Sequence, residues 1–332
     1  MRISCLLLVA VAALSPPQVQ GRTVPAEHAA ETAKPVVWRK VDSVNLADFN
    51  KDLVRGKLTM DVGVYLPSNF DPAFDKVTLA KMLDAIAAAK EIYEPTGVQI
   101  NLLWVKTGAI DPRFLAIQAN EIPRVPDTEY VNSYESSKRH PTELTAMARN
   151  AFESIIEPDR DNDRTIYLVA LQDVIMPFTE LAEGRNWTIK MVRTGGLSFP
   201  SYSYCNTMPP AFRGVITITN LSTPGRQRRT VAHEIGHKVM NVSHEYKTTN
   251  PAHEVFAEGG LMLYGSGEDI PSGAEGRWHL ERLLMSPFLY RLRSDGTRQW
   301  NPDYKEGGHY YDPLYGDKVV HFPGQTKMDP NW

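Results

Sequence analysis

Apolar residues recur with two different periods from Leu58 onward, and these periods predict an α/β domain. The stretch LTMDVGVYLP, 58–67, alternates apolar and polar residues as a strand does. Residues 77–94 instead place apolar side chains three and four positions apart, as a helix does, and VQINLLWV, 98–105, predicts a second strand. A strand, a long helix and a strand in this order favour a right-handed crossover and a parallel pair.

The next part of the chain predicts a second helix and more strands. Residues 106–140 show no clear period, and Pro141 is predicted to open the second helix. The nearly continuous apolar run TIYLVAL, 165–171, is typical of an interior strand. Residues 188–204 are predicted to be extended, and GVITITN, 214–220, alternates again.

A third helix is predicted after the turn Pro224-Gly225, and it carries VAHEIGHKVMNVSHE, 231–245. In the tail, HLERLLMSPFLYRL, 279–292, is a further helix candidate, although Pro287 interrupts it. The predicted fold class is therefore α/β in the broad sense that includes α+β. We expect a twisted mixed sheet with two long helices, a helix that carries the chemistry, and a smaller irregular C-terminal subdomain.

Residues 1–21 have the layout of a secretory signal peptide. Arg2 precedes an apolar run from Cys5 to Leu14, and a proline break and small residues follow before Arg22. The run is about half the ~20 residues that cross a bilayer, so we expect cleavage rather than a membrane anchor. The expected location is extracellular, or periplasmic in a Gram-negative bacterium. No later stretch is long and apolar enough to span a membrane.

The rest of the chain divides into an extension and a main domain. Residues 22–56 are predicted to be a leader, a removable prosegment or a strap, and 57–332 to be the main domain. Its N-terminal subdomain is expected to span 57–244 and its C-terminal subdomain 245–332. Of the 332 residues, 42% are hydrophobic and 23% charged, as in ordinary globular proteins. The formal charge of −3 provides no electrostatic case for a nucleic-acid partner, and the oligomeric state stays open.

Two histidines and a glutamate are the clearest candidates for chemistry. His233 and His237 are four residues apart, so on a helix both imidazoles can reach one Zn²⁺ at ~2.0–2.1 Å. Glu234 is then placed to take a proton from zinc-bound water. Gly236 weakens a helix by about 1 kcal/mol relative to Ala, which indicates close packing or a functional reason. The alternative interpretation is a pair of core histidines beside a solvated glutamate.

A catalytic zinc site usually has a third protein ligand, and His244 is the nearest candidate. If the helix continued, this ring would lie on the correct face but about 10 Å too far along. It can bind only if the helix ends first and the chain folds back. Asn241 could end the helix, because Asn tolerates the left-handed conformation better than most residues. Otherwise His244 is a surface histidine beside Glu245.

These residues resemble the metzincin zinc peptidases, whose pattern is HExxHxxGxxH followed by a methionine turn under the metal. Here HEIGH is followed by a later histidine and by GGLMLYG, 259–265, in which Met262 matches that methionine. The resemblance covers roughly 58–264 and implies that Tyr264 lies beside the zinc and stabilises the developing oxyanion. It also implies a protein or peptide substrate bound along an edge strand, for which GGLSFPSY, 195–202, is the candidate.

The chain departs from the metzincin pattern by one residue. The pattern places Gly at 240 and His at 243, where this chain has Met240 and Ser243. One extra residue before the turn reconciles the two, with Asn241 in place of the glycine and three residues before His244. A regular helix that is one residue longer would, however, rotate its exit by ~100°.

Two alternatives stay open. Gluzincins, another HExxH class, take a glutamate from a downstream helix, and Glu254 and Glu258 lie in range. The chain could also be an exported binding protein on a peptidase scaffold that no longer turns over substrate. The prediction that we carry forward is a secreted zinc-dependent endopeptidase, with His244 as third ligand and Glu234 as general base.

Overall fold

The computed structural model of the protein describes residues 35–122, 138–139, 143–157, 164–181, 187–199, 208–242, 260–262, 267–272, 279–302, 310–311 and 319–320. All of them belong to one compact unit, Ala33–Trp332. The expected signal peptide, 1–21, lies outside the described residues and stays a prediction. None of the described helices is long and apolar enough to cross a membrane.

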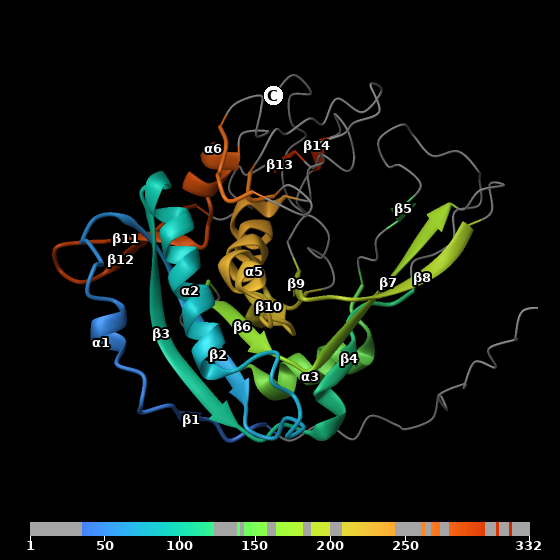
Figure 1. The fold of residues 1–332 in the computed structure, drawn as a ribbon. Coiled ribbons are helices and arrows are strands. Elements are labelled where there is room, and N and C mark those ends of the chain that lie inside the picture. The colour runs from blue at the N-terminus through green and yellow to red at the C-terminus, as the bar shows by residue number, and fades with distance from the viewer. Residues whose placement is uncertain are drawn as a thin grey trace, which may run out of the picture. The chain divides into compact units, whose positions relative to one another are not determined.

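The main sheet is mixed, and its strands lie in the order β1-β3-β2-β6-β10-β9 (Figure 1). The four central strands are parallel: β3 (Val98–Gly108), β2 (Leu58–Pro67), β6 (Ile166–Ala170) and β10 (Val215–Ile218). Two antiparallel strands border them, β1 (Arg39–Lys40) on β3 and β9 (Gly196–Ser198) on β10. The predicted parallel pair and the buried interior strand are both confirmed.

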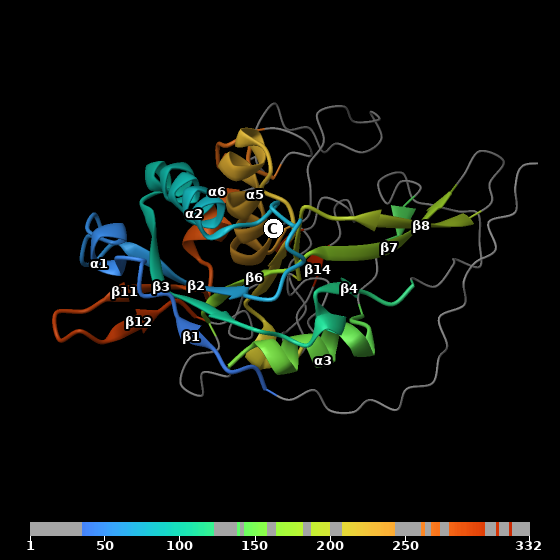
Figure 2. The ribbon, with the colours of Figure 1, turned by 60° about the horizontal axis from the view of Figure 1, so that its bottom comes forward.

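Helices cover both faces of this sheet (Figure 2). On one face α2 (Leu79–Tyr93) and α5 (Pro224–Gly236) lie side by side and pack on the Met60, Val62 and Val64 side chains of β2. On the other face α3 (Ala146–Ile155) packs against Tyr65 and Tyr167. The alternation along β2 therefore divides its side chains between two cores.

A second sheet contains β4 (Ala116–Gln118), β5 (Lys138–Arg139), β7 (Asp173–Leu181) and β8 (Trp187–Arg193). β7 and β8 form a long antiparallel hairpin that extends away from the helices (Figures 1 and 2). β8 continues through Thr194 and Gly195 into β9, so the hairpin joins the edge of the main sheet. The extended conformation predicted for 188–204 is confirmed as two strands, while 200–204 lies outside the described residues.

The second helix begins later than predicted, at Ala146 instead of Pro141. The side chain of Thr145 accepts a hydrogen bond from the Ala148 N–H and so caps the helix at that point. Leu144, which the sequence pattern placed on the helix, forms an isolated bridge with Asn120.

The helix predicted over 279–292 is helical only in its first part. α6 (His279–Leu284) ends before Pro287, which lacks the N–H that would continue the helix. The second part is strand β11 (Leu289–Leu292), which pairs with β2 and with β12 (Arg298–Trp300). The C-terminal region therefore adds a strand to the main sheet. The remaining short elements are α1 (Leu46–Phe49), the 3₁₀ turns Glu94–Thr96, Pro112–Phe114 and Pro210–Phe212, and the pair β13 (Tyr310–Tyr311) and β14 (Val319–Val320).

Residues 35–56 lie against the main domain. The Trp38 indole N–H donates to the Ile155 carbonyl at 2.8 Å. Asn50 exchanges two hydrogen bonds with the backbone of Leu102, at 2.9 and 3.0 Å. The described part of the extension is therefore packed on the main sheet. The three interpretations of residues 22–56, a leader, a removable prosegment or a strap, stay open.

Candidate metal centre

The helix that carries HEIGH begins behind a side-chain cap. Thr223 accepts a hydrogen bond from the Arg226 N–H at 3.3 Å, and Pro224 occupies the first turn, where a missing N–H costs nothing. Residues 231–236 are all buried at the other end of α5. The candidate chemistry therefore lies on a helix segment enclosed by other parts of the chain.

His233 and His237 face each other across one helical turn. Their Nε2 atoms are 3.2 Å apart, and the residues are 6% and 7% exposed. Nδ1 of His233 lies 2.7 Å from the Leu261 carbonyl oxygen, and Nδ1 of His237 lies 2.7 Å from that of Val242. Because a carbonyl oxygen only accepts, each Nδ1 carries the proton, and each Nε2 directs a lone pair toward the other ring.

This arrangement fits a metal ion better than it fits two imidazoles alone. Two lone pairs that face each other repel, and a proton does not fill the gap near neutral pH. Burial lowers the pKa of His237 to about 4, and burial together with the neighbouring His237 lowers the pKa of His233 well below 6.5. Two nitrogens bound tetrahedrally to Zn²⁺ at 2.0–2.1 Å lie about 3.3 Å apart, close to the observed separation.

Glu234 lies between the two histidines in the sequence and touches strand β9. Its carboxylate accepts a hydrogen bond from the Ser198 N–H, and a Cβ placed on Gly196 would lie 2.7 Å from Glu234 Cγ. Burial raises the pKa of Glu234 to about 8, although the Ser198 hydrogen bond and the charges of Arg229 and Lys238 act in the opposite direction. A carboxyl group with this pKa is suited to exchange protons near neutral pH.

Met262 packs against the helix at Gly236. A Cβ added to Gly236 would lie 2.5 Å from Met262 Sδ and 2.9 Å from Met240 Cε. The close packing that the sequence predicted at Gly236 is therefore confirmed. Without a side chain at this position, the methionine sulfur can approach the backbone between the two histidines.

The helix ends in a π-helical turn, His237–Asn241. Asn241 has a φ of 55°, and Val242 after it is extended. A π turn closes its hydrogen bonds over one residue more than an α turn does, so it takes up an additional residue. The ~100° rotation expected of a longer regular helix therefore does not apply, and the chain leaves the helix before His244.

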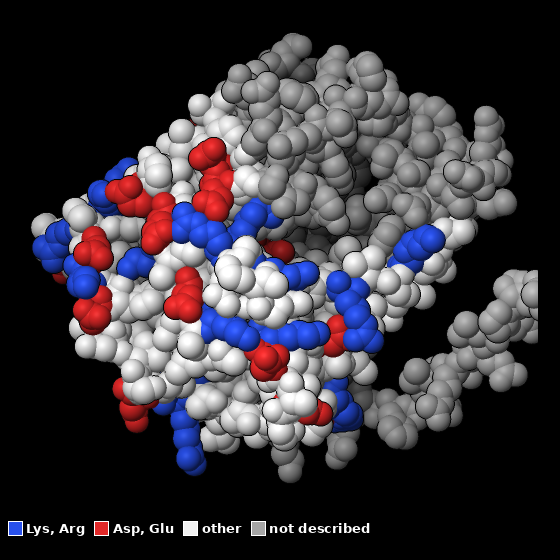
Figure 3. Space-filling model, in the orientation of Figure 1, with Lys and Arg blue, Asp and Glu red and all other residues white. Residues whose placement is uncertain are grey.

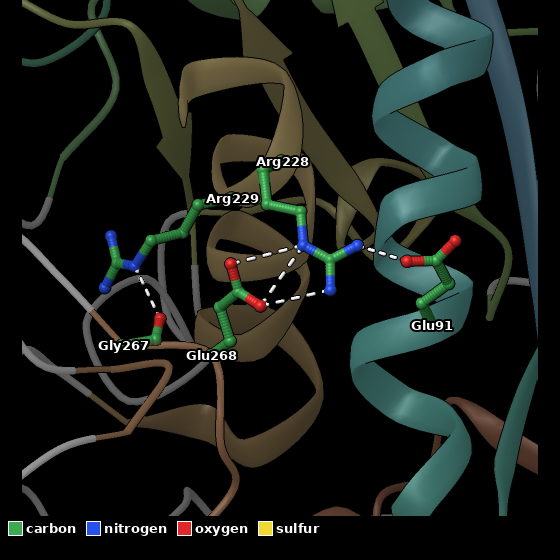
Figure 4. A network of polar contacts seen from close by, with 5 residues as sticks. All are labelled: Glu91, Arg228, Arg229, Gly267 and Glu268. Carbon is green, nitrogen blue, oxygen red and sulfur yellow. Dashed lines mark hydrogen bonds and ion pairs between the residues drawn. The ribbon is translucent and has the colours of Figure 1, made fainter. Parts of the chain in front are cut away.

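Arg229 binds two backbone carbonyls, and Figure 4 shows the contact with Gly267. Its guanidinium donates to the Leu261 carbonyl at 2.6 Å and to the Gly267 carbonyl at 2.8 Å. The Leu261 oxygen is also the partner of His233 Nδ1. Arg229 therefore holds the Leu261 carbonyl in place, and this carbonyl orients His233, one turn further along α5.

Arg228, one position earlier, binds Glu268 and also Glu91 of α2 (Figure 4). These side chains are at least 40% exposed, so the ion pairs contribute little to stability. Their effect is to connect α2, α5 and the segment after residue 267. Acidic and basic side chains are interspersed over the face drawn in Figure 3.

Residues 190–259 match the family model Peptidase M78, described as the IrrE N-terminal-like domain. No curated protein matches the sequence. The matched segment covers about a fifth of the chain and includes β9, β10, α5 and the π turn. It supports a zinc-peptidase-like domain around the two histidines, and it does not distinguish a metzincin from other zinc peptidases.

Four candidate site residues lie outside the described residues: His244, Glu254, Glu258 and Tyr264. Within the described ranges, no group of three or more His, Cys, Asp or Glu side chains could hold a metal. The metal ion and its three ligands, His233, His237 and His244, therefore stay predictions. Arg229 and Lys238 have no recognisable signal in the sequence, because their partners are backbone carbonyls of distant segments.

Replacing Gly236 with Ala should destabilise the protein. The added methyl group meets Met262 and Met240, and such overpacking costs about 1–3 kcal/mol. This cost exceeds the roughly 1 kcal/mol that Ala gains over Gly in a helix. Urea denaturation measures the difference. Gly225→Ala is the matched control on the same helix, since nothing lies within 4 Å of a Cβ there. Equal effects of the two substitutions would contradict this account of Gly236.

The metal-free protein should lose stability from His237 as the pH falls below 6.5. Its folded pKa of about 4 is depressed, so the unfolded chain binds the proton first. The contribution is complete above pH 6.5 and is lost toward pH 4, a change on the order of 3 kcal/mol. Glu234, whose pKa is raised, acts in the opposite direction, so wild type must be compared with a variant.

Denaturation with a chelator present, between pH 7.5 and 4.5, tests this dependence. His237→Gln removes the titrating group, and its stability should fall less than that of wild type over this range. Identical pH profiles for the two proteins would rule out a buried neutral His237.

Proposed function

We propose that the protein is a zinc-dependent peptidase that uses His233 and His237 as ligands. The observation that carries the proposal is the pair of Nε2 atoms at 3.2 Å, each in a ring whose Nδ1 contacts a carbonyl oxygen. The match to a peptidase family over the same segment supports it. When bound, zinc supplies Lewis acidity, which makes water acidic near neutral pH and polarises a peptide carbonyl.

Glu234 is the proposed general base. Its carboxylate takes a proton from the attacking water and gives it to the leaving amine. The Ser198 N–H and the nearby cations Arg229 and Lys238 favour the ionised form, whereas burial favours the protonated form. The balance keeps both forms accessible near neutral pH, as a group that accepts and returns a proton requires.

The proposed substrate is an extended peptide bound along β9. Among the described strands β9 is the last in its sheet, and it pairs with β10 only. An edge strand offers backbone groups to a second strand. Gly196 allows this strand to approach the Glu234 side chain, so a peptide paired with β9 would pass close to the base.

We infer that the site is of metzincin type, with His244 as third ligand and Tyr264 beside the zinc. In support, the helix ends at a left-handed Asn241, three residues before His244, which is the separation of glycine and histidine in that pattern. Met262 contacts the metal-binding helix. Export through the signal peptide, 1–21, completes the proposal.

Glu234→Gln should abolish peptide hydrolysis while zinc stays bound. The amide oxygen can still accept the Ser198 hydrogen bond, so the fold persists, but the base is lost and the rate falls about 10²–10⁴-fold. Zinc content and hydrolysis of an unstructured protein such as casein are measured together.

The control is Glu91→Gln, which replaces an exposed glutamate of α2 and should leave the rate unchanged. A zinc-loaded Glu234→Gln protein with wild-type activity would remove Glu234 as base. A zinc-loaded wild type that cleaves nothing would favour a binding protein.

The third ligand is identified by comparing His244→Ala with Glu254→Ala and Glu258→Ala. Loss of a true ligand should weaken zinc binding by more than about 100-fold, which exceeds the 10–100-fold effect of residues that only orient ligands. Competition with a chromogenic chelator measures the affinity. A large loss confined to Glu254→Ala or Glu258→Ala would replace the metzincin assignment with a gluzincin one.

A further inference from the structure

We propose that Lys238 is a positioning residue that holds the end of strand β9 against the metal-binding helix and so sets the register of the substrate. This inference rests on the proposed peptidase function. Lys238 follows the ligand His237 on the π turn and is 1% exposed. Its Nζ donates a hydrogen bond to the carbonyl of Phe199, the residue directly after β9.

Lys238 and Glu234 bind neighbouring backbone groups of the same strand. The two side chains are four residues apart, so they project from one face of the helix. Glu234 accepts from the Ser198 N–H, and Lys238 donates to the Phe199 carbonyl. Because one contact needs a donor and the other an acceptor, the strand cannot slide by one residue without losing both. Glu234 and Lys238 together therefore hold β9 against the helix and also fix its register relative to the helix.

Phe199 is also held from the opposite face of the sheet. Its ring is buried and packs edge-on against Phe152 of α3, with 5.4 Å between ring centroids. The ring belongs to the core under α3, whereas Lys238 reaches the carbonyl from the side of α5. Loss of the lysine contact therefore leaves the ring anchored and the strand in the sheet, but it releases the Phe199 carbonyl and leaves the Ser198 contact of Glu234 as the remaining one of the pair.

The positions of β9 and the metal-binding helix together determine where a paired peptide meets the base. A displacement of about 1 Å at a positioned substrate can reduce the rate 10²-fold. Peptides long enough to pair with β9 depend on this alignment. A dipeptide derivative that occupies only the positions next to the zinc does not, so substrate length separates positioning from general damage.

The test compares three variants of the zinc-loaded full chain. Lys238→Met removes the donor, and Lys238→Arg keeps one. Lys90→Met is the matched control, because Lys90, on α2 and remote from β9, makes the same kind of hydrogen bond to the Phe49 carbonyl.

For an extended peptide, Lys238→Met should lower kcat/KM about tenfold or more, chiefly through KM. The loss on the dipeptide derivative should be several-fold smaller, because removing the Lys238 charge affects the Glu234 base equally with both substrates, and zinc affinity should change less than about twofold. Lys238→Arg should restore part of the loss, and Lys90→Met should match wild type. Equal losses on both substrates, or a loss of zinc, would overturn the proposal.

Amide hydrogen exchange tests the contact between Lys238 and β9 without a measurement of activity. Exchange at residues 197–199 should be about tenfold faster in Lys238→Met than in wild type or Lys90→Met. If wild type hydrolyses no peptide, the peptidase proposal fails, yet this measurement still tests the contact. Unchanged exchange in the folded variant would refute the role of Lys238. Should Lys238→Met not fold, Lys238→Gln replaces it, since its polar side chain is one atom too short to reach the carbonyl.

Discussion

The hydrogen bonds between two imidazole rings and two backbone carbonyls determine the chemistry of this site. If either Nδ1 lacked its carbonyl, that ring could turn its N–H toward the other, and the two histidines would bind each other. With both Nδ1 protons engaged, the two Nε2 lone pairs face each other in a buried space, a geometry that fits the proposed metal ion. The acceptors come from Val242, directly after the π turn, and from Leu261, far along the chain. The site therefore forms only when the end of the helix and the 260–262 segment are both in place.

This dependence explains why so much of the surrounding packing concerns backbone position. Arg229 binds the Leu261 carbonyl, and Gly236 leaves room for Met262, the residue after Leu261. On the other side, Glu234 and Lys238 hold the backbone of β9. Burial lowers the pKa of Lys238 well below its usual value, because a charge is costly at this enclosed position. An apolar side chain could fill the same space, but it would not donate a hydrogen bond to the Phe199 carbonyl.

The central sheet and the helix that carries HEIGH could be predicted from the sequence because both follow from local periods. The alternation in 58–67 reflects a strand with one core on each face, and its predicted bounds agree with β2. β7 was not predicted. Its residues include Pro177, which is rare in strands, but Pro177 falls between the residues paired with β4 and those paired with β5. Leu289–Leu292 was assigned to a helix, because a short apolar run has no distinctive period. The contact of Lys238 with a carbonyl 39 residues away leaves no local pattern at all.

The spacing of HEIGH and the later histidine illustrates what a motif assumes. The HExxHxxG part of the pattern describes positions on a helix of constant pitch, on which every added residue is a rotation of ~100°. The π turn removes that assumption, since it takes up one residue between His237 and the end of the helix. The position that must adopt the left-handed conformation is then Asn241, and asparagine is among the few residues that tolerate it. The left-handed Asn241 precedes His244 by three residues, as the glycine precedes the last histidine in the family pattern. The additional residue of this chain lies in the π turn between His237 and Asn241.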